Sequence, residues 1–305
     1  MKKQLVMLVM LFSIGLTVNA QKEYRLAKTT GHLKLNLNGA IIEGYDGKEI
    51  VFSNKNNTAV EVDERAKGLE AITTSGYKDN TGMGISVKEN GDEVQVNYVF
   101  SNNSDILTIK VPQGMKVSFN NNSNQYYEDI IIKNIKGEIE VATHYNKIKL
   151  ENNSGPMNIS SINGAVEATF VGEIKGPISI VSIRDYVDIT LPVNTKGNIE
   201  LASNYGKIYA AKDFKIDIEK EDSEKKIYTQ TPSAFTGTNV KAGNKAPGNQ
   251  INRNTQNTTS ALNTLGNVSI GYAPNTAEII KGKLNGGGID LIFKSINNNV
   301  YLRNK

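Results

Sequence analysis

The sequence predicts an all-β chain that folds as a single-stranded β-solenoid, a β-helix-like stack of coils of about 20 residues each. Three observations predict this fold. Apolar and polar residues alternate along most of the chain, Gly and Asn interrupt the alternating runs, and the middle of the chain repeats its own pattern. Helical periodicity is nearly absent.

Residues 1–20 have the pattern of a secretory signal peptide. Lys2 and Lys3 precede an apolar run from Leu5 to Leu16, and the small residues Val18 and Ala20 follow it. The run is shorter than the roughly 20 residues that a membrane-spanning helix needs. We expect cleavage after Ala20 and export to the periplasm, the outer surface or the medium, with an uncleaved N-terminal anchor as the alternative. No later segment is long and apolar enough to cross a membrane.

The composition of the chain after Ala20 bounds the class of protein. Its length suits one large domain or two ordinary ones. Residues 1–20 contain two lysines and no acid, so the rest of the chain has 35 − 2 = 33 basic and 31 acidic residues. This nearly balanced charge does not indicate a protein that binds nucleic acid. The chain has no Cys, so the fold uses no disulfide and no N-terminal lipid anchor through Cys.

Residues 21–111 form the predicted N-terminal β region, the first strands or coils of the stack. Its alternating runs are separated by turns such as Gly44 to Gly47. The expected strands lie at 33–37, 41–42, 50–52, 83–87, 94–100 and 106–111.

Residues 112–220 form the predicted repeat region. KGEIEVATHYNKIK at 136–149 and KGNIELASNYGKIY at 196–209 are identical at 8 of 14 positions, and two looser copies lie between them. The copies begin around Gly137, Gly155, Gly176 and Gly197, with spacings of 18, 21 and 21 along the chain. We expect the glycines at corners, where the backbone needs positive φ or close approach. The apolar residues of successive copies, from Ile139 onwards, should stack in columns that share one core.

Residues 221–262 differ in composition from the rest of the chain. Between Thr231 and Ser260, 19 of 30 residues are Gly, Asn, Thr, Ser or Pro, and apolar residues are isolated. We interpret this segment as a low-complexity mobile insertion, with a binding loop that orders on contact as the alternative. Strand patterns return in residues 263–305, which we expect to form the closing coils or a final hairpin.

Several stretches resemble the putative-adhesin family of bacterial envelope proteins, a β-strand-repeat family without an established activity. They are LKLNLNGAIIEGYDGKEIVF at 33–52, GLEAITTSGYKDNTGMGISVKENGDEVQV at 68–96, the KGxIE copies at Lys136 and Lys196, and the terminal GGGIDLIFKSINNNVYLRN. The resemblance covers nearly the whole chain after residue 20. It implies a solenoid-like fold and an exported location, and it supplies no catalytic residue.

A search for chemistry identifies no catalytic site, metal site or cofactor site. The two histidines, His32 and His144, are far apart in sequence, and HExxH, GxSxG and a repeated GGxGxD are all missing. Glu140 and Glu200 occupy equivalent positions about three coils, or roughly 14 Å, apart, which exceeds the carboxylate separation of a glycoside hydrolase. We therefore expect no enzyme activity.

The candidate ligand-binding residues are three tyrosines of the repeat. Tyr145 and Tyr205 occupy equivalent positions, and Tyr186 is displaced by two. They could expose a strip of rings to a glycan or a protein, although bulky corner residues with a structural role are the interpretation we favour.

The sequence thus predicts a non-catalytic exported envelope or surface protein, an adhesin-like scaffold or binding module. One alternative is a solenoid-type carbohydrate-active enzyme that uses Glu138 or Asp185. The other is a periplasmic accessory or sensor protein of a membrane regulatory system. The oligomeric state and the partner, a protein or a glycan, are not predicted.

Overall fold

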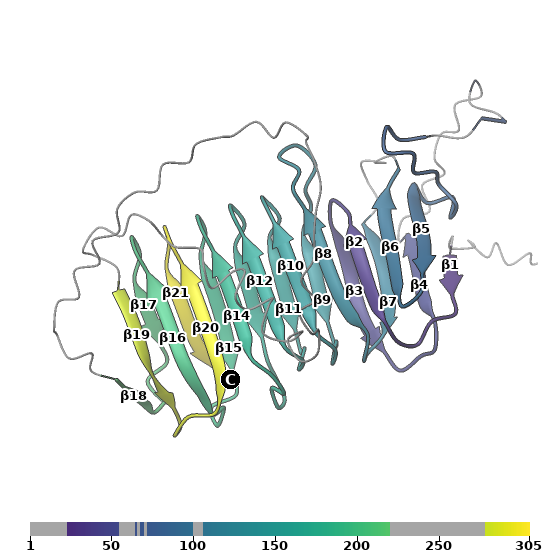
Figure 1. The fold of residues 1–305 in the computed structure, drawn as a ribbon. Coiled ribbons are helices and arrows are strands. Elements are labelled where there is room, and N and C mark those ends of the chain that lie inside the picture. The colour runs from purple at the N-terminus through teal and green to yellow at the C-terminus, as the bar shows by residue number, and fades with distance from the viewer. Residues whose placement is uncertain (1–22, 55–64, 66–67, 70–71, 100–105, 220–277) are drawn as a thin grey trace, which may run out of the picture. The chain divides into compact units, whose positions relative to one another are not determined.

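All regular elements that the structure describes are β-strands (Figure 1). The computed structural model describes residues 23–54, 65, 68–69, 72–99, 106–219 and 278–305. The strands form two large mixed sheets of 10 and 11 strands, so the prediction of an all-β chain is confirmed for these residues. The predicted signal peptide (1–20) and the predicted insertion (221–262) lie outside the described residues.

We call the two sheets sheet A and sheet B and give their strands in spatial order. Sheet A contains β1 (Glu23–Leu26), β4 (Ile50–Asn54), β7 (Leu107–Pro112), β3 (Ala40–Tyr45), β9 (Ile130–Lys133), β11 (Ile148–Glu151), β13 (Val166–Thr169), β15 (Val187–Leu191), β21 (Val300–Asn304) and β17 (Ile208–Ala210). Sheet B contains β18 (Ile216–Ile218), β19 (Glu278–Leu284), β16 (Gly197–Ser203), β20 (Ile289–Ser295), β14 (Ile178–Ser182), β12 (Met157–Ser161), β10 (Ile139–Thr143), β8 (Lys116–Asn121), β2 (His32–Asn36), β6 (Glu93–Tyr98) and β5 (Ile85–Asn90).

The alternating sequence pattern buries one face of each sheet in a common hydrophobic core. In β12, for example, Met157 and Ile159 are buried, and the intervening Asn158 is half-exposed. The buried residues of both sheets belong to one cluster, within one compact unit of the chain. Among the described residues no helix is long and apolar enough to span a membrane.

Successive strands of the repeat alternate between the two sheets. We call a sheet B strand and the next sheet A strand of the same copy a strand pair; β10–β11, β12–β13 and β14–β15 are three neighbouring strand pairs. Ile139 pairs with Met157 and Met157 with Ile178, in parallel register. The spacing of the repeat therefore places equivalent apolar residues side by side, as predicted.

The repeat glycines are required for close approach of the backbone. None of Gly137, Gly155, Gly176 and Gly197 has a positive φ. A Cβ on Gly137 would overlap the carbonyl oxygen of Met115, and a Cβ on Gly155 would overlap that of Gly137. Of the two roles expected for these glycines, close packing of one copy on the next is therefore the one that applies.

The last two strands do not close the stack, contrary to one of the two expectations for residues 263–305, whereas β19 lies near the end of sheet B, between β16 and β18. β20 lies between β14 and β16, and β21 lies between β15 and β17. The predicted column of Ile139, Met157, Ile178 and Ile199 thus contains Leu291 between its last two members. The N-terminal pair is also internal: β2 lies between β6 and β8, and β3 between β7 and β9.

Four buried serines at the ends of the sheet B strands confirm this spatial order. We call Ser161, Ser182, Ser295 and Ser203 the serine ladder; each accepts a hydrogen bond from the backbone N–H three residues later. The hydroxyl groups of the last three donate to the backbone carbonyl of the preceding turn, those of Gly164, Asp185 and Asn298 respectively. The side-chain hydroxyls therefore connect neighbouring turns through groups that are otherwise remote from water.

Candidate functional site

Three tyrosines gather on the outer face of sheet A near its β17 edge. Tyr301 of β21 pairs directly with Tyr209 of β17, and their rings stack with centroids 5.3 Å apart and an interplanar angle of 8°. Tyr186, which precedes β15, meets Tyr301 edge-on at 6.4 Å. We call these three residues the tyrosine cluster. It joins segments from three strand pairs because β21 is inserted between β15 and β17.

The planar, positively charged guanidinium group of Arg303 lies next to the tyrosine cluster. Its guanidinium carbon lies 5.3 Å from the centroid of the Tyr301 ring. Two nitrogens of the same guanidinium donate to the carboxylate of Asp188, at 2.7 and 2.9 Å. This bidentate pairing raises the pKa of Arg303 and fixes the orientation of its planar group. Both groups reach solvent, so the pair contributes geometry more than stability.

The hydroxyl group of Tyr186 belongs to a charged network. It donates to Glu167 at 2.6 Å, and Lys147 pairs with the same carboxylate oxygen at 2.7 Å. The hydrogen bond to Glu167 raises the pKa of Tyr186, and burial adds to the increase. Partial burial would raise the pKa of Glu167, but the bonds from Lys147 and Tyr186 outweigh it and lower that pKa. Tyr186 is therefore held in place and is neutral at physiological pH.

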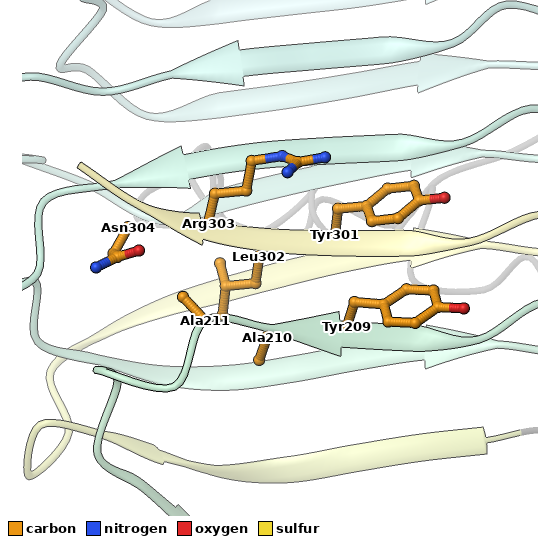
Figure 2. Close-up of a pocket in the computed structure, with 7 residues that line it drawn as sticks. All are labelled: Tyr209, Ala210, Ala211, Tyr301, Leu302, Arg303 and Asn304. Atoms are coloured by element: carbon orange, nitrogen blue, oxygen red, sulfur yellow. The ribbon is translucent and has the colours of Figure 1, made fainter.

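An open hollow of about 360 Å³ lies beside the stacked rings (Figure 2). Its lining residues are Tyr209, Ala210, Ala211, Tyr301, Leu302, Arg303 and Asn304. They offer ring surface, a guanidinium and an amide, and none of these seven residues has a carboxylate or a thiol. Such a lining suits the binding of a polar ring by stacking and hydrogen bonds.

The structure does not bring the three predicted tyrosines together. Tyr145 stacks on Tyr127, with centroids 5.2 Å apart, and Tyr205 is 65% exposed in the turn before β17. The turns that hold Tyr145 and Tyr205 are four strand spacings, or about 19 Å, apart. Tyr186 is the one member of the predicted set in the cluster, and sequence reasoning missed Tyr209 and Tyr301.

A signal for the missing pair was present in the sequence. Lys207-Ile208-Tyr209 and Asn299-Val300-Tyr301 both follow a Ser-x-x-Gly or Ser-x-x-Asn turn, at Ser203 and Ser295. Alignment of these turns would have placed Tyr209 and Tyr301 at equivalent positions. Their adjacency depends on the insertion of β21, which no local pattern states.

A second polar network lies on the outer face of sheet B. The Nε2 atom of His32 is 2.6 Å from the hydroxyl oxygen of Ser118, and that hydroxyl donates to Glu140 at 2.9 Å. Lys116 forms ion pairs with Glu140 at 2.9 Å and Glu138 at 3.3 Å. In a hydrolase triad the carboxylate binds the other ring nitrogen of the histidine, whereas here it binds the serine. This network therefore lacks the order of hydrogen bonds that activates a serine.

Electrostatics keep His32 neutral and Glu140 charged. Burial lowers the pKa of His32, and the charges of Lys116 and Lys34 lower it further against the opposing effect of Glu140 and Glu93. Burial would raise the pKa of Glu140, but hydrogen bonds from Lys116 and Ser118 outweigh it and lower that pKa. Lys34 itself pairs with Glu93 at 2.6 Å.

The equivalent acids of the repeat are farther apart than predicted. Because β20 intervenes, Glu140 and Glu200 are separated by four strand spacings, or about 19 Å, instead of three. Glu200 pairs with Lys294 of β20 at 2.6 Å. Among the described residues, no three His, Cys, Asp or Glu side chains gather as a metal site would require.

Comparisons with known proteins give a distant structural likeness. No family model and no curated protein matches the chain. A crystal structure of a putative cell adhesion protein from Clostridium sporogenes is similar over 93% of this chain and 100% of that chain, with 12% identity and a TM-score of 0.39. A likeness with a TM-score of this size establishes neither a shared fold nor a shared function.

Proposed function

We propose that this protein is a non-catalytic, adhesin-like protein of the bacterial surface that binds a glycan at the tyrosine cluster. The observation that carries the proposal is the stacked pair of Tyr301 and Tyr209 beside the hollow, with Arg303 oriented by Asp188. Sugar rings present apolar C–H faces and a rim of hydroxyls. A ring face next to a guanidinium and the Asn304 amide complements both features.

The accessibility of the cluster supports binding over a purely structural role. Tyr209 is 47% exposed, although its ring makes a stacked contact on one side. The open hollow beside it leaves room for a ligand. A ring that only capped a corner would not need a fixed guanidinium beside it. Arg303 is held in position by Asp188, a residue of the neighbouring strand, and this arrangement pre-organises the surface.

We also infer that the strand pairs are coils of a β-solenoid and that the protein is exported. Parallel registers of equivalent residues, common to both sheets, support the first inference. The charged and apolar pattern of residues 1–20 supports the second. In such a protein the outer faces of the coils would present the tyrosine cluster to the surroundings of the cell.

Glycan binding is tested with purified protein on an array of oligosaccharides, followed by titration of the strongest glycan. Tyr209→Ala should weaken that interaction by about tenfold, because loss of one stacking ring costs about 1.4 kcal/mol. Tyr209→Phe keeps the ring and should retain most of the affinity. Tyr205→Ala is the matched control, since it removes an exposed tyrosine outside the hollow.

Two results would count against the proposal. One is the absence of any retained glycan on the array. The other is an equal effect of Tyr209→Ala and Tyr205→Ala, which would place binding elsewhere or favour the strip predicted from the sequence.

A further inference from the structure

The last two strands, β20 and β21, lie inside the sheets, between the strand pairs β14–β15 and β16–β17; we call this position the slot. In sheet B, β20 pairs with β14 through five residues and with β16 through seven. In sheet A, β21 pairs with β15 through five residues and with β17 through three. All four pairings are parallel, as between neighbouring copies of the repeat. β20 and β21 thus pair as a copy of the repeat would, although they come from a distant part of the chain (Figure 1).

The slot lies between two copies that are consecutive in sequence. β14–β15 is followed directly by β16–β17, and five residues (192–196) connect them. Five residues (152–156) also connect β11 to β12, which are in adjacent strand pairs. The connection from β15 to β16 therefore passes the inserted strands β20 and β21 with the same number of residues as a connection between adjacent strand pairs. The repeat alone would pair β14 with β16, which means that the inserted strands take the place of a direct neighbour.

The hydrogen bonds that hold the segment 278–304 join it to residues that are present in every molecule of this protein. The side-chain amide of Asn285, in the turn between β19 and β20, donates to the carbonyls of Val193 and Thr195 at 2.9 and 2.8 Å. The hydroxyl of Ser295 donates to the carbonyl of Asp185, and Ser203 donates to Asn298. An identical segment from a second molecule would form the same hydrogen bonds and the same parallel pairings.

The chain length permits exchange between molecules. The link between Ile218, the end of β18, and Glu278, the start of β19, consists of residues 219–277. Fully extended, a chain of that length spans up to about 200 Å. Short connections, such as the five residues before β12, tie the other repeat strands to their neighbours. By its number of residues alone, the link is long enough for the segment 278–304 to reach the slot of another molecule.

We propose that the segment 278–304 is exchanged between two copies of this chain: β20 and β21 of each copy fill the slot of the other, and β19 pairs with β16 and β18 of the other. Exchange of identical elements preserves every intramolecular contact as an intermolecular one, so its free-energy cost is small. It requires opening of the slot, and it should therefore occur when molecules refold together at high concentration. The partner is a second copy of the chain, and the product is a dimer with two tyrosine clusters, each built from both chains.

Introduced cysteines can report the exchange, because the chain has none of its own. Ser179 of β14 and Ile292 of β20 are register partners on the outer face of sheet B. Paired Cα atoms in neighbouring strands are about 4.8 Å apart, which lies within the range of a disulfide. A chain that carries both Ser179→Cys and Ile292→Cys should form an intramolecular disulfide under mild oxidation, as the reference for correct geometry.

The test uses two chains with one substitution each. Chains with Ser179→Cys and chains with Ile292→Cys are unfolded, mixed, refolded at high concentration and oxidised. The expected product is a covalent dimer whose mass-spectrometric peptides link the two positions. The matched control mixes Asn158→Cys with Ser179→Cys; these positions are register partners in β12 and β14, whose short connections prevent exchange. The control should lack the linked peptide.

Each result decides the matter. A linked peptide from the first mixture, missing from the control, supports exchange. The proposal is overturned if the doubly substituted chain forms its disulfide while the first mixture gives no more linked peptide than the control. If the doubly substituted chain forms no disulfide, the same chain and the same two mixtures are treated with a short bifunctional thiol reagent, which tolerates the Cβ spacing of parallel strands, and the same comparison of linked peptides supports or overturns the proposal.

Discussion

Ser182 provides the sharpest test of the serine ladder. Its side chain is fully buried at the end of β14. The hydroxyl donates to the carbonyl of Gly164 at 3.0 Å and accepts the N–H of Asp185 at 3.2 Å. Ser182→Ala leaves both backbone groups without this partner, in a turn that neighbouring strand pairs cover.

The expected loss follows from the cost of unpaired buried polar groups. One such group costs about 1–3 kcal/mol. The bond to the Gly164 carbonyl is buried and the bond from the Asp185 N–H is only partly buried, so we expect the free energy of unfolding to fall by about 2 kcal/mol. Ser179 is the matched control, because it lies on the same strand and faces outward. Ser179→Ala should change the free energy of unfolding by no more than about 0.5 kcal/mol.

Urea unfolding followed by circular dichroism measures the difference between the two variants, as a shift of the midpoint at unchanged slope. Hydrogen exchange of the Asp185 amide adds a local measurement, since that N–H loses its acceptor in Ser182→Ala. Equal midpoints for Ser182→Ala and Ser179→Ala would refute the role of the ladder. Unchanged exchange at Asp185 would show that the hydroxyl does not accept that hydrogen bond.

Two further predictions concern backbone packing and pH. Gly164→Ala should reduce stability by about 1–3 kcal/mol, because its Cβ would overlap the carbonyl oxygen of Asn146, whereas Gly172→Ala, with open space around it, should have little effect on the urea midpoint. Burial and the nearby lysines lower the pKa of His32 from its ordinary 6.5, so the unfolded chain binds the proton first as the pH falls. The stability that neutral His32 contributes is therefore fully present above pH 6.5, and it is lost as the pH falls from 6.5 towards the pKa of His32 in the folded protein. In His32→Asn, urea midpoints measured across this window should fall less than in the unsubstituted protein, and an equal fall in both would contradict the assignment.

The sequence predicts local structure and neighbouring registers well, because both follow from short-range patterns. Alternation places Ile139 and Met157 in the core, and the repeat spacing aligns them. Glycine spacing identifies the corners but leaves open whether φ or space is the constraint. The close approach of Gly155 to the carbonyl of Gly137 shows that space is the constraint, and this approach can be seen only in three dimensions.

The order of the strand pairs could not be predicted in the same way. Ile289, Leu291 and Phe293 alternate with polar or half-exposed positions as any copy of the repeat does, so the pattern fits several places in the stack. The position of β20 and β21 in the sheets depends on contacts between residues far apart in sequence, on either side of the link between Ile218 and Glu278. The tyrosine cluster is a product of that position. It was therefore missed together with the insertion.

The same topology determines how molecules of this kind can associate. Sheet A ends at β1 and β17, and sheet B ends at β5 and β18. β17 and β18 are only three residues long, and β1, β5 and β18 all pair antiparallel to their neighbours, so within the described residues the parallel repeat has no long edge strand open for a further copy. Short edges disfavour edge-to-edge pairing. The long parallel pairing edges lie inside the slot, where β20 and β21 cover them. Association of two chains through strands should therefore proceed by exchange of that segment, and each exchange would rebuild the tyrosine cluster with Tyr301 from one chain and Tyr209 from the other.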